Sequence, residues 1–332
     1  MMKLGTMQAL TGTVNEKWKS AIADQIVSCW EHDKGTARYF RASANFQFVF
    51  QRAGAQYFLR FNHSTERSVD RIRAEVDYIN YLSSKGLVVA KPVSSIAGHF
   101  VESVSTSQGI FHAVVFEGLA GEQFEEMEEL TPEIFMRWGQ ALGELHQAAK
   151  GYKARARPTW QDHLAMVSEY LPATEQSARS ALSELQEQLT GLSMNEGNYG
   201  LIHFDFELDN IVWNGDKVGI VDFDDSAEYW FVADIAFALR DLLCGSAENV
   251  ELQNESFQNF VAGYRQAKQV TQQDLELVPM FLRLHNLITF AKLHRAVGIP
   301  ETAGEPVWLE QLRNKLILKM QIYRDGFLRD VQ

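Results

Sequence analysis

The chain has 332 residues, 46% hydrophobic and 22% charged, with two cysteines and a formal net charge of −12. This composition predicts one large or two modest globular domains, and the acidic balance argues against nucleic acid as a partner. With no apolar run of about 18 residues, no apolar leader and no disulfide framework, we expect no membrane span and a cytoplasmic, reducing location.

The first third of the chain predicts a helix, then strands, then a second helix. Apolar residues recur with helical spacing over 15–30. Aromatic residues alternate over 37–51 and again over 56–61, and a glycine-containing turn between these runs predicts a hairpin. A second helix is expected from Thr65, a capping residue, to Gly86, which can end it.

One carboxylate breaks the apolar pattern of this second helix. Glu75 falls within its apolar stripe, which consists of Val69, Ile72, Val76 and Ile79. A charge on that side either reaches solvent at the edge of the stripe or needs a partner, because an unpaired buried charge is costly. Position alone leaves both readings open.

The chain changes character near residues 117–121. A strand ends there, a glycine-bearing connection follows, and the rest is mainly helical. We therefore predict an N-terminal lobe of sheet and helix over 1–117 and a mainly helical lobe over 118–332, with a cleft between them. The first helix of the second lobe has Thr131 as cap and Pro132 at its first position. Further helices are expected near 163–190, 231–244, 254–267, 273–296 and 305–327.

The stretch "LIHFDFELDNIVW", 201–213, concentrates polar groups between two apolar runs. His203, Asp205 and Asn210 have the spacing H-x-D-x-x-x-x-N, and the "NGD" that follows predicts a hairpin whose return strand delivers Asp222. In phosphoryl transfer, such an Asp accepts the proton of the attacking hydroxyl, while the Asn and the later Asp hold Mg²⁺ through hard oxygen ligands. A loop of solvated acids is the structural alternative.

These segments resemble the aminoglycoside phosphotransferase and choline kinase family, small-molecule kinases related to protein kinases. The resembling stretches are "HFDFELDN", "VDFDD" and "FVADIA", and the likeness extends over roughly 35–245. The resemblance implies a bilobal α+β fold with a small antiparallel sheet and a helical second lobe. It implies Asp205 as catalytic base, His203 as a brace of its loop, Asn210 and Asp222 as metal ligands, and Asp234 as a support behind the loop.

In the first lobe, the resemblance implies that Arg60 binds nucleotide phosphates and that Glu75 is its ion-pair partner. Arg60 replaces the lysine that is usual in the wider kinase fold, and a surface arginine is the alternative reading. The loop expected to cover the phosphates has no glycine, and Ser43 and Asn45 are its candidate contacts, through backbone N–H groups of the turn.

Three other positions either depart from the family pattern or add carboxylates beyond those that the motif needs. Phe204 stands where the family usually has glycine. Asp224 and Asp225 add carboxylates, either as a second metal ligand or as a cap or solvated turn. In "LGELHQ", we expect His146 to pack and form hydrogen bonds rather than to catalyse.

The resemblance implies an enzyme that uses ATP and Mg²⁺ to phosphorylate a hydroxyl group of a small molecule. Aminoglycoside, amino-alcohol, homoserine-like amino acid and sugar all remain open as acceptor, and the pocket is expected after residue 245. A protein Ser/Thr kinase and a nucleotide-binding pseudokinase module are the alternatives; a metal-dependent hydrolase is a weaker one. Only eleven residues separate Asp222 from Asp234, with no A-P-E signature, which favours a small acceptor over a peptide.

Overall fold

The computed structural model describes residues 1–124, 127, 130–243, 251–298 and 305–329. By its internal contacts the chain forms two compact units. The first unit contains residues 1–80, 90–118 and 292–322, and the second contains 81–89, 119–291 and 323–332. These units are defined by contacts, and the domain boundary expected between residues 117 and 118 stays a prediction.

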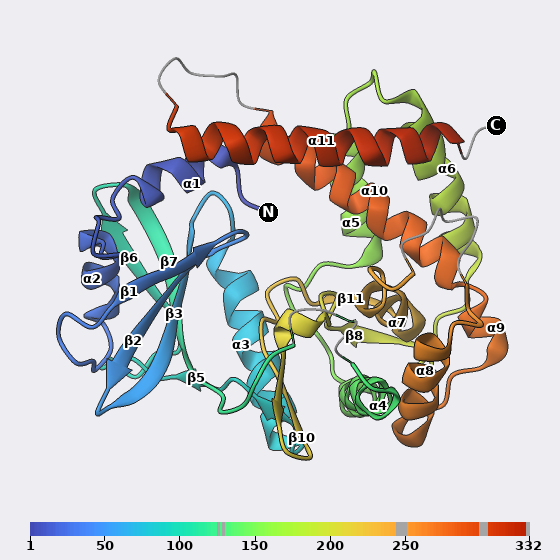
Figure 1. Cartoon of the computed structure of the whole chain (residues 1–332), viewed down its shortest axis with the longest axis horizontal. Helices are drawn as coiled ribbons and strands as arrows, with labels where there is room; N and C mark the ends of the chain where they lie inside the picture. The colour runs from blue at the N-terminus through green and yellow to red at the C-terminus, as the bar shows by residue number, and fades with distance from the viewer. Residues whose placement is uncertain (125–126, 128–129, 244–250, 299–304, 330–332) are drawn as a thin grey trace. The chain divides into compact units, whose positions relative to one another are not determined.

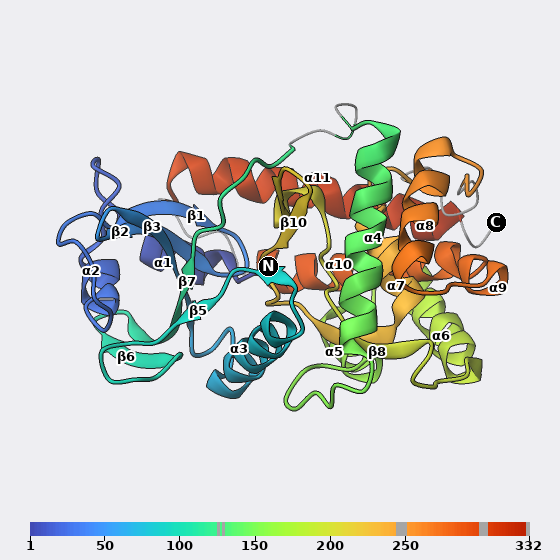
Figure 2. The same ribbon diagram turned by 90° about the horizontal axis from the view of Figure 1, so that it is seen from below.

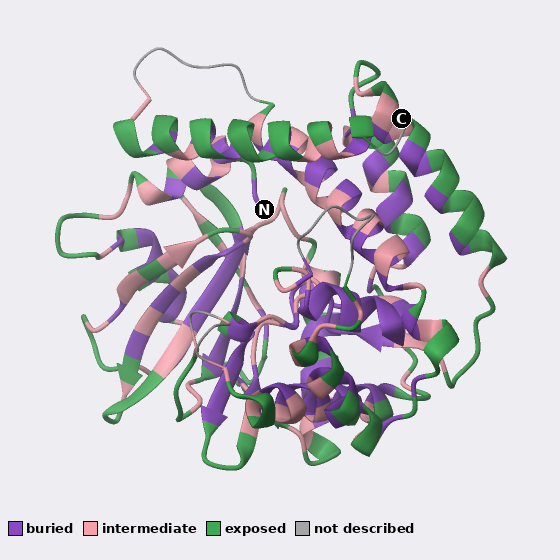
Figure 3. Ribbon diagram, turned by 45° about the vertical axis from the view of Figure 1, so that its right-hand side comes forward, coloured by how far each residue is buried: buried purple, intermediate pink, exposed green. Residues whose placement is uncertain are grey.

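An antiparallel sheet is the centre of the first unit (Figure 1). Its strand order is β1-β2-β3-β7-β5, with β6 paired to β7, and every pairing is antiparallel. The alternation of aromatic residues explains the sheet, since Phe46, Phe48 and Phe50 are all buried. Figure 3 shows buried stretches along the strands of this sheet. The strands are β1 (Arg38–Ala42), β2 (Phe46–Arg52), β3 (Ala55–His63), β5 (Pro92–Val93), β6 (Glu102–Thr106) and β7 (Gly109–Glu117).

The helix expected over 15–30 is much shorter in the structure. Helix α2 covers Ala21–Val27, and a further helix, α1 (Leu4–Thr11), was not predicted. Trp18 has a positive φ of 59° and is 61% exposed, so it lies outside the helix. Trp30 is buried beyond the helix end, and its indole Nε1 donates to the carbonyl of Val93. Tertiary packing therefore explains the buried Trp30, whereas the exposed Trp18 contributes to no helical apolar face.

Helix α3 (Val69–Ser84) begins four residues after the predicted start. Ser68 lies just before it and accepts a bond from the Arg71 amide through its Oγ, whereas the hydroxyl of Thr65 bonds the ring of His63. The predicted cap at Thr65 is therefore wrong. The predicted end is confirmed, because Gly86 follows the helix with a φ of 92°, a left-handed conformation that suits glycine.

The second unit is mainly helical, with small sheets between its helices. Strand β8 (Tyr199–Ile202) pairs with β11 (Ala227–Trp230), and β9 (Ile211–Asn214) pairs with β10 (Lys217–Ile220), which also pairs with β4 (Val88–Val89). Helices α10 and α11 contribute residues to both units. The helices are α4 (Pro132–Ala149), α5 (Trp160–Tyr170), α6 (Gln176–Gly191), α7 (Phe231–Ala238), α8 (Glu255–Ala267), α9 (Gln272–Leu275), α10 (Val278–Val297) and α11 (Val307–Arg329).

Helices α4 and α8 pack backbone to backbone (Figure 2). A Cβ atom at Gly139 would lie 1.9 Å from the carbonyl oxygen of Phe260, and one at Gly263 would lie 1.7 Å from that of Met136. Only glycine fits at these positions. Thr131 caps α4 through the amide of Ile134, and Pro132 opens the helix as predicted. Among the described residues, no helix is both long enough and apolar enough to span a membrane.

Candidate active site

Strand β8 leads directly into the loop that holds the predicted catalytic residues. The carboxylate of Asp234, at the start of α7, accepts bonds from the amides of His203 and Phe204, both at 2.8 Å. It also accepts from Nε2 of His146 at 3.0 Å. Asp234 is fully buried, and a buried carboxylate needs such donors. The helix start is thereby fastened to the backbone of the loop, the geometry expected of a supporting residue.

The unusual phenylalanine in this loop has a backbone explanation. Phe204 has a φ of 74°, in the left-handed region that glycine adopts without strain. A bulky residue there costs about 1–3 kcal/mol. Phe204 is 3% exposed, and its ring lies against the rings of His163, Phe237 and other aromatic residues. Burial of the ring offsets the backbone strain, so a loop shape that suits glycine is kept by a core aromatic residue.

His203 uses both ring nitrogens inside the protein. Its Nε2 lies 3.0 Å from the carbonyl oxygen of Val221, so Nε2 carries the proton and donates. Its Nδ1 then accepts from the amide of Asp205 at 3.3 Å. The ring is fully buried and links the loop to the residue that precedes Asp222. These bonds suit a brace rather than a proton carrier.

Asn210 connects the candidate base to the candidate metal ligand. Its Nδ2 donates to the backbone oxygen of Asp205 at 2.9 Å and to Oδ2 of that residue at 3.3 Å. The β9–β10 hairpin forms as predicted, and the amide of Val221 donates to the carbonyl of Asn210 at 3.0 Å. Asp222 follows immediately, with a φ of 59°. The hairpin thus brings Asn210 next to the backbone that carries Asp222.

The side-chain oxygen of Asn210 fits a metal ligand. This Oδ1 is buried and has no hydrogen-bond partner among the described residues. An unsatisfied buried oxygen is costly unless a ligand supplies the missing interaction. The described residues contain no cluster of three or more His, Cys, Asp or Glu side chains arranged to hold a metal. A site of Asn210 and Asp222 would therefore be sparse, as is usual for Mg²⁺ that keeps waters and binds phosphates.

An arginine that the sequence analysis missed lies beside the candidate base. Nη2 of Arg240 lies 3.4 Å from Oδ1 of Asp205 and forms an ion pair with Glu207. Its Nη1 donates to the carbonyl of Phe237 at 3.0 Å, at the end of α7. The carboxylate of Asp205 is thereby contacted on one oxygen by Asn210 and on the other by Arg240, while its side chain keeps 41% exposure. The base candidate is positioned yet accessible.

His146 packs and forms hydrogen bonds, as the sequence analysis expected. Its Nδ1 lies 2.9 Å from the hydroxyl of Tyr264, and its Nε2 bonds Asp234. Burial lowers the pKa of His146 below its ordinary value, and the hydrogen bond with Asp234 acts in the opposite direction. The neutral ring therefore donates from Nε2 and accepts from the tyrosine. This role is structural, because His146 reaches the loop only through Asp234.

In the first unit, Arg60 and Glu75 form the predicted ion pair. Nη2 of Arg60 lies 2.5 Å from Oε2 of Glu75, and their side chains are only 4% and 0% exposed. The guanidinium also lies over the ring of Phe116, 5.0 Å from its centroid. The other oxygen of Glu75 is buried without a hydrogen-bond partner among the described residues. The reading of Arg60 as a surface arginine is therefore wrong, and its phosphate-binding role stays a prediction.

We predict strong coupling between Arg60 and Glu75. Arg60→Met or Glu75→Gln alone should lower the free energy of unfolding by about 3 kcal/mol, because each leaves a buried charge unpaired. The double variant should cost clearly less than the sum of the singles. Urea unfolding measures these energies, and calorimetry with ATP tests whether Arg60→Met also weakens nucleotide binding.

The exposed pair Arg52–Glu31 provides a matched control. Its side chains are 36% and 69% exposed at an N–O distance of 2.6 Å, so its coupling should not exceed about 1 kcal/mol. If the losses of the two single variants at Arg60 and Glu75 simply add, their coupling energy is no larger than that of the control pair. That result would contradict direct coupling.

The predicted phosphate-covering turn lies at the same sheet. Residues 43–45 connect β1 and β2, and the Asn62 side chain donates to the carbonyl of Ala44. Ser43 is exposed, whereas Asn45 is buried and its Oδ1 accepts from Gln47 at 3.1 Å. The ladder pairs Gln47 with Arg60. The turn therefore ends two residues before the ladder partner of Arg60, and its contact with a nucleotide stays a prediction.

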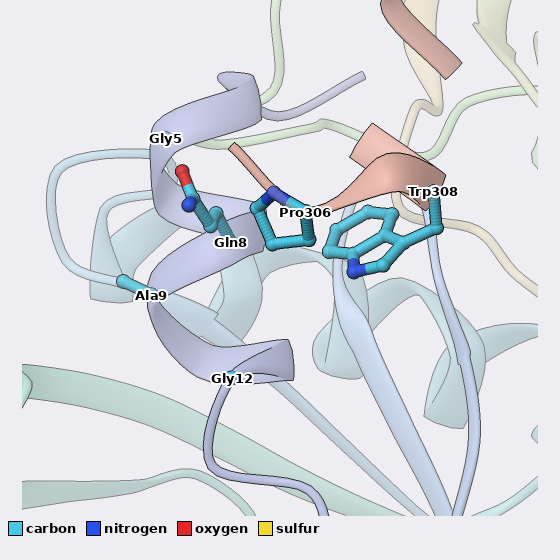
Figure 4. A pocket seen from close by; sticks show the side chains of 6 residues that line it. All are labelled: Gly5, Gln8, Ala9, Gly12, Pro306 and Trp308. Atoms are coloured by element: carbon cyan, nitrogen blue, oxygen red, sulfur yellow. The ribbon is translucent and has the colours of Figure 1, made fainter. Parts of the chain in front are cut away.

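A cavity of about 360 Å³ lies elsewhere in the first unit, between α1 and the start of α11 (Figure 4). No predicted site residue lines it, and its walls are mostly small or apolar. Its lining gives no sign of the chemistry expected at a phosphoryl-transfer site. The lining residues are Gly5, Gln8, Ala9, Gly12, Pro306 and Trp308.

The antiparallel sheet, the helical second unit and the Asp205–Asn210 loop define a phosphotransferase of the protein-kinase-like fold. Residues 36–273 match the Phosphotransferase enzyme family, APH, and the chain belongs to this family. It is 27% identical to an amicoumacin kinase of Bacillus subtilis (strain 168) over 82% of this chain and 83% of the relative.

Solved structures confirm the predicted fold class. The amicoumacin kinase hAmiN, in complex with AMP-PNP, Ca²⁺ and Ami, has a TM-score of 0.77 at 24% identity and covers 96% of both chains. A microcompartment-associated aminopropanol kinase has a TM-score of 0.68 at 21% identity, over 92% of this chain and 94% of that one. The resemblance inferred from the motifs is thus confirmed, as is the prediction of a kinase that phosphorylates hydroxyl groups of small molecules.

Proposed function

We propose that this kinase transfers the γ-phosphate of ATP, with Mg²⁺, to a hydroxyl of an amino-alcohol, aminoglycoside, homoserine-like amino acid or sugar. The observation that carries the proposal is the double use of Asn210. Its Nδ2 holds Asp205, and its buried Oδ1 has no hydrogen-bond partner among the described residues. One side chain can thus serve both the base and a metal. The names of the relatives, amicoumacin kinase and aminopropanol kinase, favour a small acceptor.

The proposed reaction needs little covalent chemistry from the protein. Asp205 accepts the proton of the acceptor hydroxyl, whose oxygen forms the new bond to phosphorus as the bond to ADP breaks. Asn210 and Asp222 would hold Mg²⁺, which neutralises charge on the phosphates when it is bound. His203 and Asp234 keep the loop in shape, so the contribution of the chain is positioning and charge stabilisation.

The segment after Asp222 supports a small acceptor over a protein acceptor. In a protein kinase, a long activation segment follows the metal-binding Asp and carries the peptide. Here residues 223–226 form a short bend, β11 uses 227–230, and α7 begins at Phe231. No chain is left over for a peptide shelf. The alternative of a pseudokinase is disfavoured by the presence of Asp205, Asn210 and Asp222 together.

An acceptor screen tests this proposal. The purified chain is incubated with labelled ATP or GTP, Mg²⁺ and single acceptors, beginning with amicoumacin, aminopropanol, homoserine, kanamycin and choline. Phosphorylation of at least one acceptor by the wild type, lost with EDTA, is the expected result. Label that enters proteins of a cell extract, with no transfer to any metabolite, would overturn the small acceptor. Acceptor phosphorylation that persists in EDTA would overturn the metal.

A further inference from the structure

A buried arginine outside the family motifs contacts the segment that follows Asp222. Nε of Arg157 donates to the carbonyl of Ser226 at 2.9 Å. Its Nη2 lies 2.7 Å from that same oxygen, 2.7 Å from the carbonyl of Asp224 and 3.1 Å from the carbonyl of Phe223. Three carbonyls of one short bend therefore converge on a single guanidinium.

This arrangement explains why a charge is buried here. Arg157 is 7% exposed, and a guanidinium loses much hydration at such a position. Backbone carbonyls compensate because the planar fork presents several donors in fixed directions, which a lysine cannot reproduce. The carbonyl oxygens in turn gain a charged donor, and that of Phe223 also accepts from the amide of Ser226 at 3.1 Å. Arg157 and the bend therefore stabilise one shape together.

The bend begins directly after Asp222. Asp222 has a φ of 59°, and a left-handed residue persists only when its surroundings hold it. On its N-terminal side, Val221 is fixed by the amide bond to Asn210 and by His203. On its C-terminal side, the ring of Phe223 lies against that of His203, and the carbonyls of the bend accept from Arg157. The geometry therefore clamps Asp222 from both directions.

The element that carries Arg157 is itself anchored to the strand after the bend. Pro158 accepts a bond from the amide of Glu228 through its carbonyl at 2.8 Å, and Thr159 forms a parallel bridge with Glu228. Thr159 is also the cap of α5, in a reciprocal capping box with Asp162. Arg157 thus lies in a short segment that leads into a capped helix and is bonded to β11.

We propose that Arg157 is a positioning residue for Asp222, which sets the affinity of the candidate metal site without touching the metal. This inference rests on the proposed function, in which Asp222 is a metal ligand. Groups that orient a metal ligand typically affect affinity by about 10–100-fold when removed. Sequence reasoning had no signal for Arg157, since it lies 65 residues before Asp222 and in no motif.

The test measures metal affinity rather than activity. Mn²⁺ is titrated by electron paramagnetic resonance into the full chain with saturating AMP-PNP. Arg157→Gln should weaken Mn²⁺ binding by about 10–100-fold, and Arg157→Lys should lie between Gln and wild type because one ammonium can satisfy only part of the carbonyl set. Arg155→Gln, two residues away and exposed, is the matched control and should bind as wild type does.

Three outcomes would overturn the proposal. Arg157→Lys and Arg157→Gln with Mn²⁺ affinities within twofold of wild type would remove the positioning role. Circular dichroism of the same samples measures the unfolded fraction of each variant. If Mn²⁺ affinity falls only in proportion to that fraction, the role of Arg157 is purely structural. A wild type that binds no Mn²⁺ with the nucleotide would instead refute the metal in the proposed function, and the inference with it.

Discussion

Asp205→Asn is expected to lower turnover by about 10²–10⁴-fold, the range that a positioned general base contributes. The substitution keeps the size of the side chain and removes its ability to take a proton. Nucleotide affinity should change little, because the candidate metal ligands Asn210 and Asp222 are untouched. Steady-state kinetics with the best acceptor, together with calorimetric titration of Mg-ATP, separates the two effects.

Asp209→Asn is the matched control for this variant. Asp209 is an exposed carboxylate of the same loop, in the short 3₁₀ helix that ends at Asn210. A loss caused by the charge of the loop alone would appear in both variants. Full turnover of Asp205→Asn would remove this residue from the reaction, and an equal loss in Asp209→Asn would reduce its role to that of a general negative charge.

Asp222→Asn is expected to weaken binding of the metal–nucleotide complex by at least about 100-fold. Removing a group that only orients a metal ligand commonly weakens metal binding by about 10–100-fold. Removing the charge of the ligand itself should therefore weaken binding by about 100-fold or more. Asparagine is chosen over alanine because φ at this position is 59°, and asparagine tolerates the left-handed region. The backbone should therefore stay intact while the charge is lost.

Calorimetry with ATP in the presence and absence of Mg²⁺ measures this prediction. Asp216→Asn, on the exposed turn of the β9–β10 hairpin, is the control and should bind as wild type does. If Asp222→Asn retains the Mg²⁺-dependent part of ATP affinity, Asp222 is not a metal ligand. In that case Asn210 would need another partner for its buried oxygen.

Short-range patterns in the sequence were the reliable ones. His203, Asp205 and Asn210 lie within eight consecutive residues, and a two-strand hairpin is enough to bring Asp222 to them. Glu75 was noticed because a charge interrupts an apolar stripe, and the structure supplies Arg60 as its partner. Local geometry determines the neighbours within the hairpin, whereas the pairing of Glu75 with Arg60 was implied by the family resemblance and not by the apolar stripe.

Contacts between distant segments outside the family motifs were not predictable. Arg157 and Arg240 belong to no periodic pattern, and each meets its partners only through the fold of the second unit. The helix expected over 15–30 failed for a related reason. Trp18 and Trp30 satisfy helical spacing, but Trp18 is exposed with a positive φ. Trp30 is buried, and its indole bonds the carbonyl of Val93 in β5. Whether such an aromatic residue belongs to a helix therefore depends on where the fold buries it, which spacing in the sequence does not show.

The anchoring of Phe204 has a consequence for how this part of the protein opens. Its amide and that of His203 bond a carboxylate of α7, while its ring is packed against Tyr229, Phe237 and His285. Solvent cannot reach these amides by local fraying, because exposing them requires withdrawing a core ring and releasing a helix. Their hydrogen exchange should therefore follow a cooperative, sub-global unfolding event, and these two residues, directly before the candidate base, should be among the slowly exchanging ones.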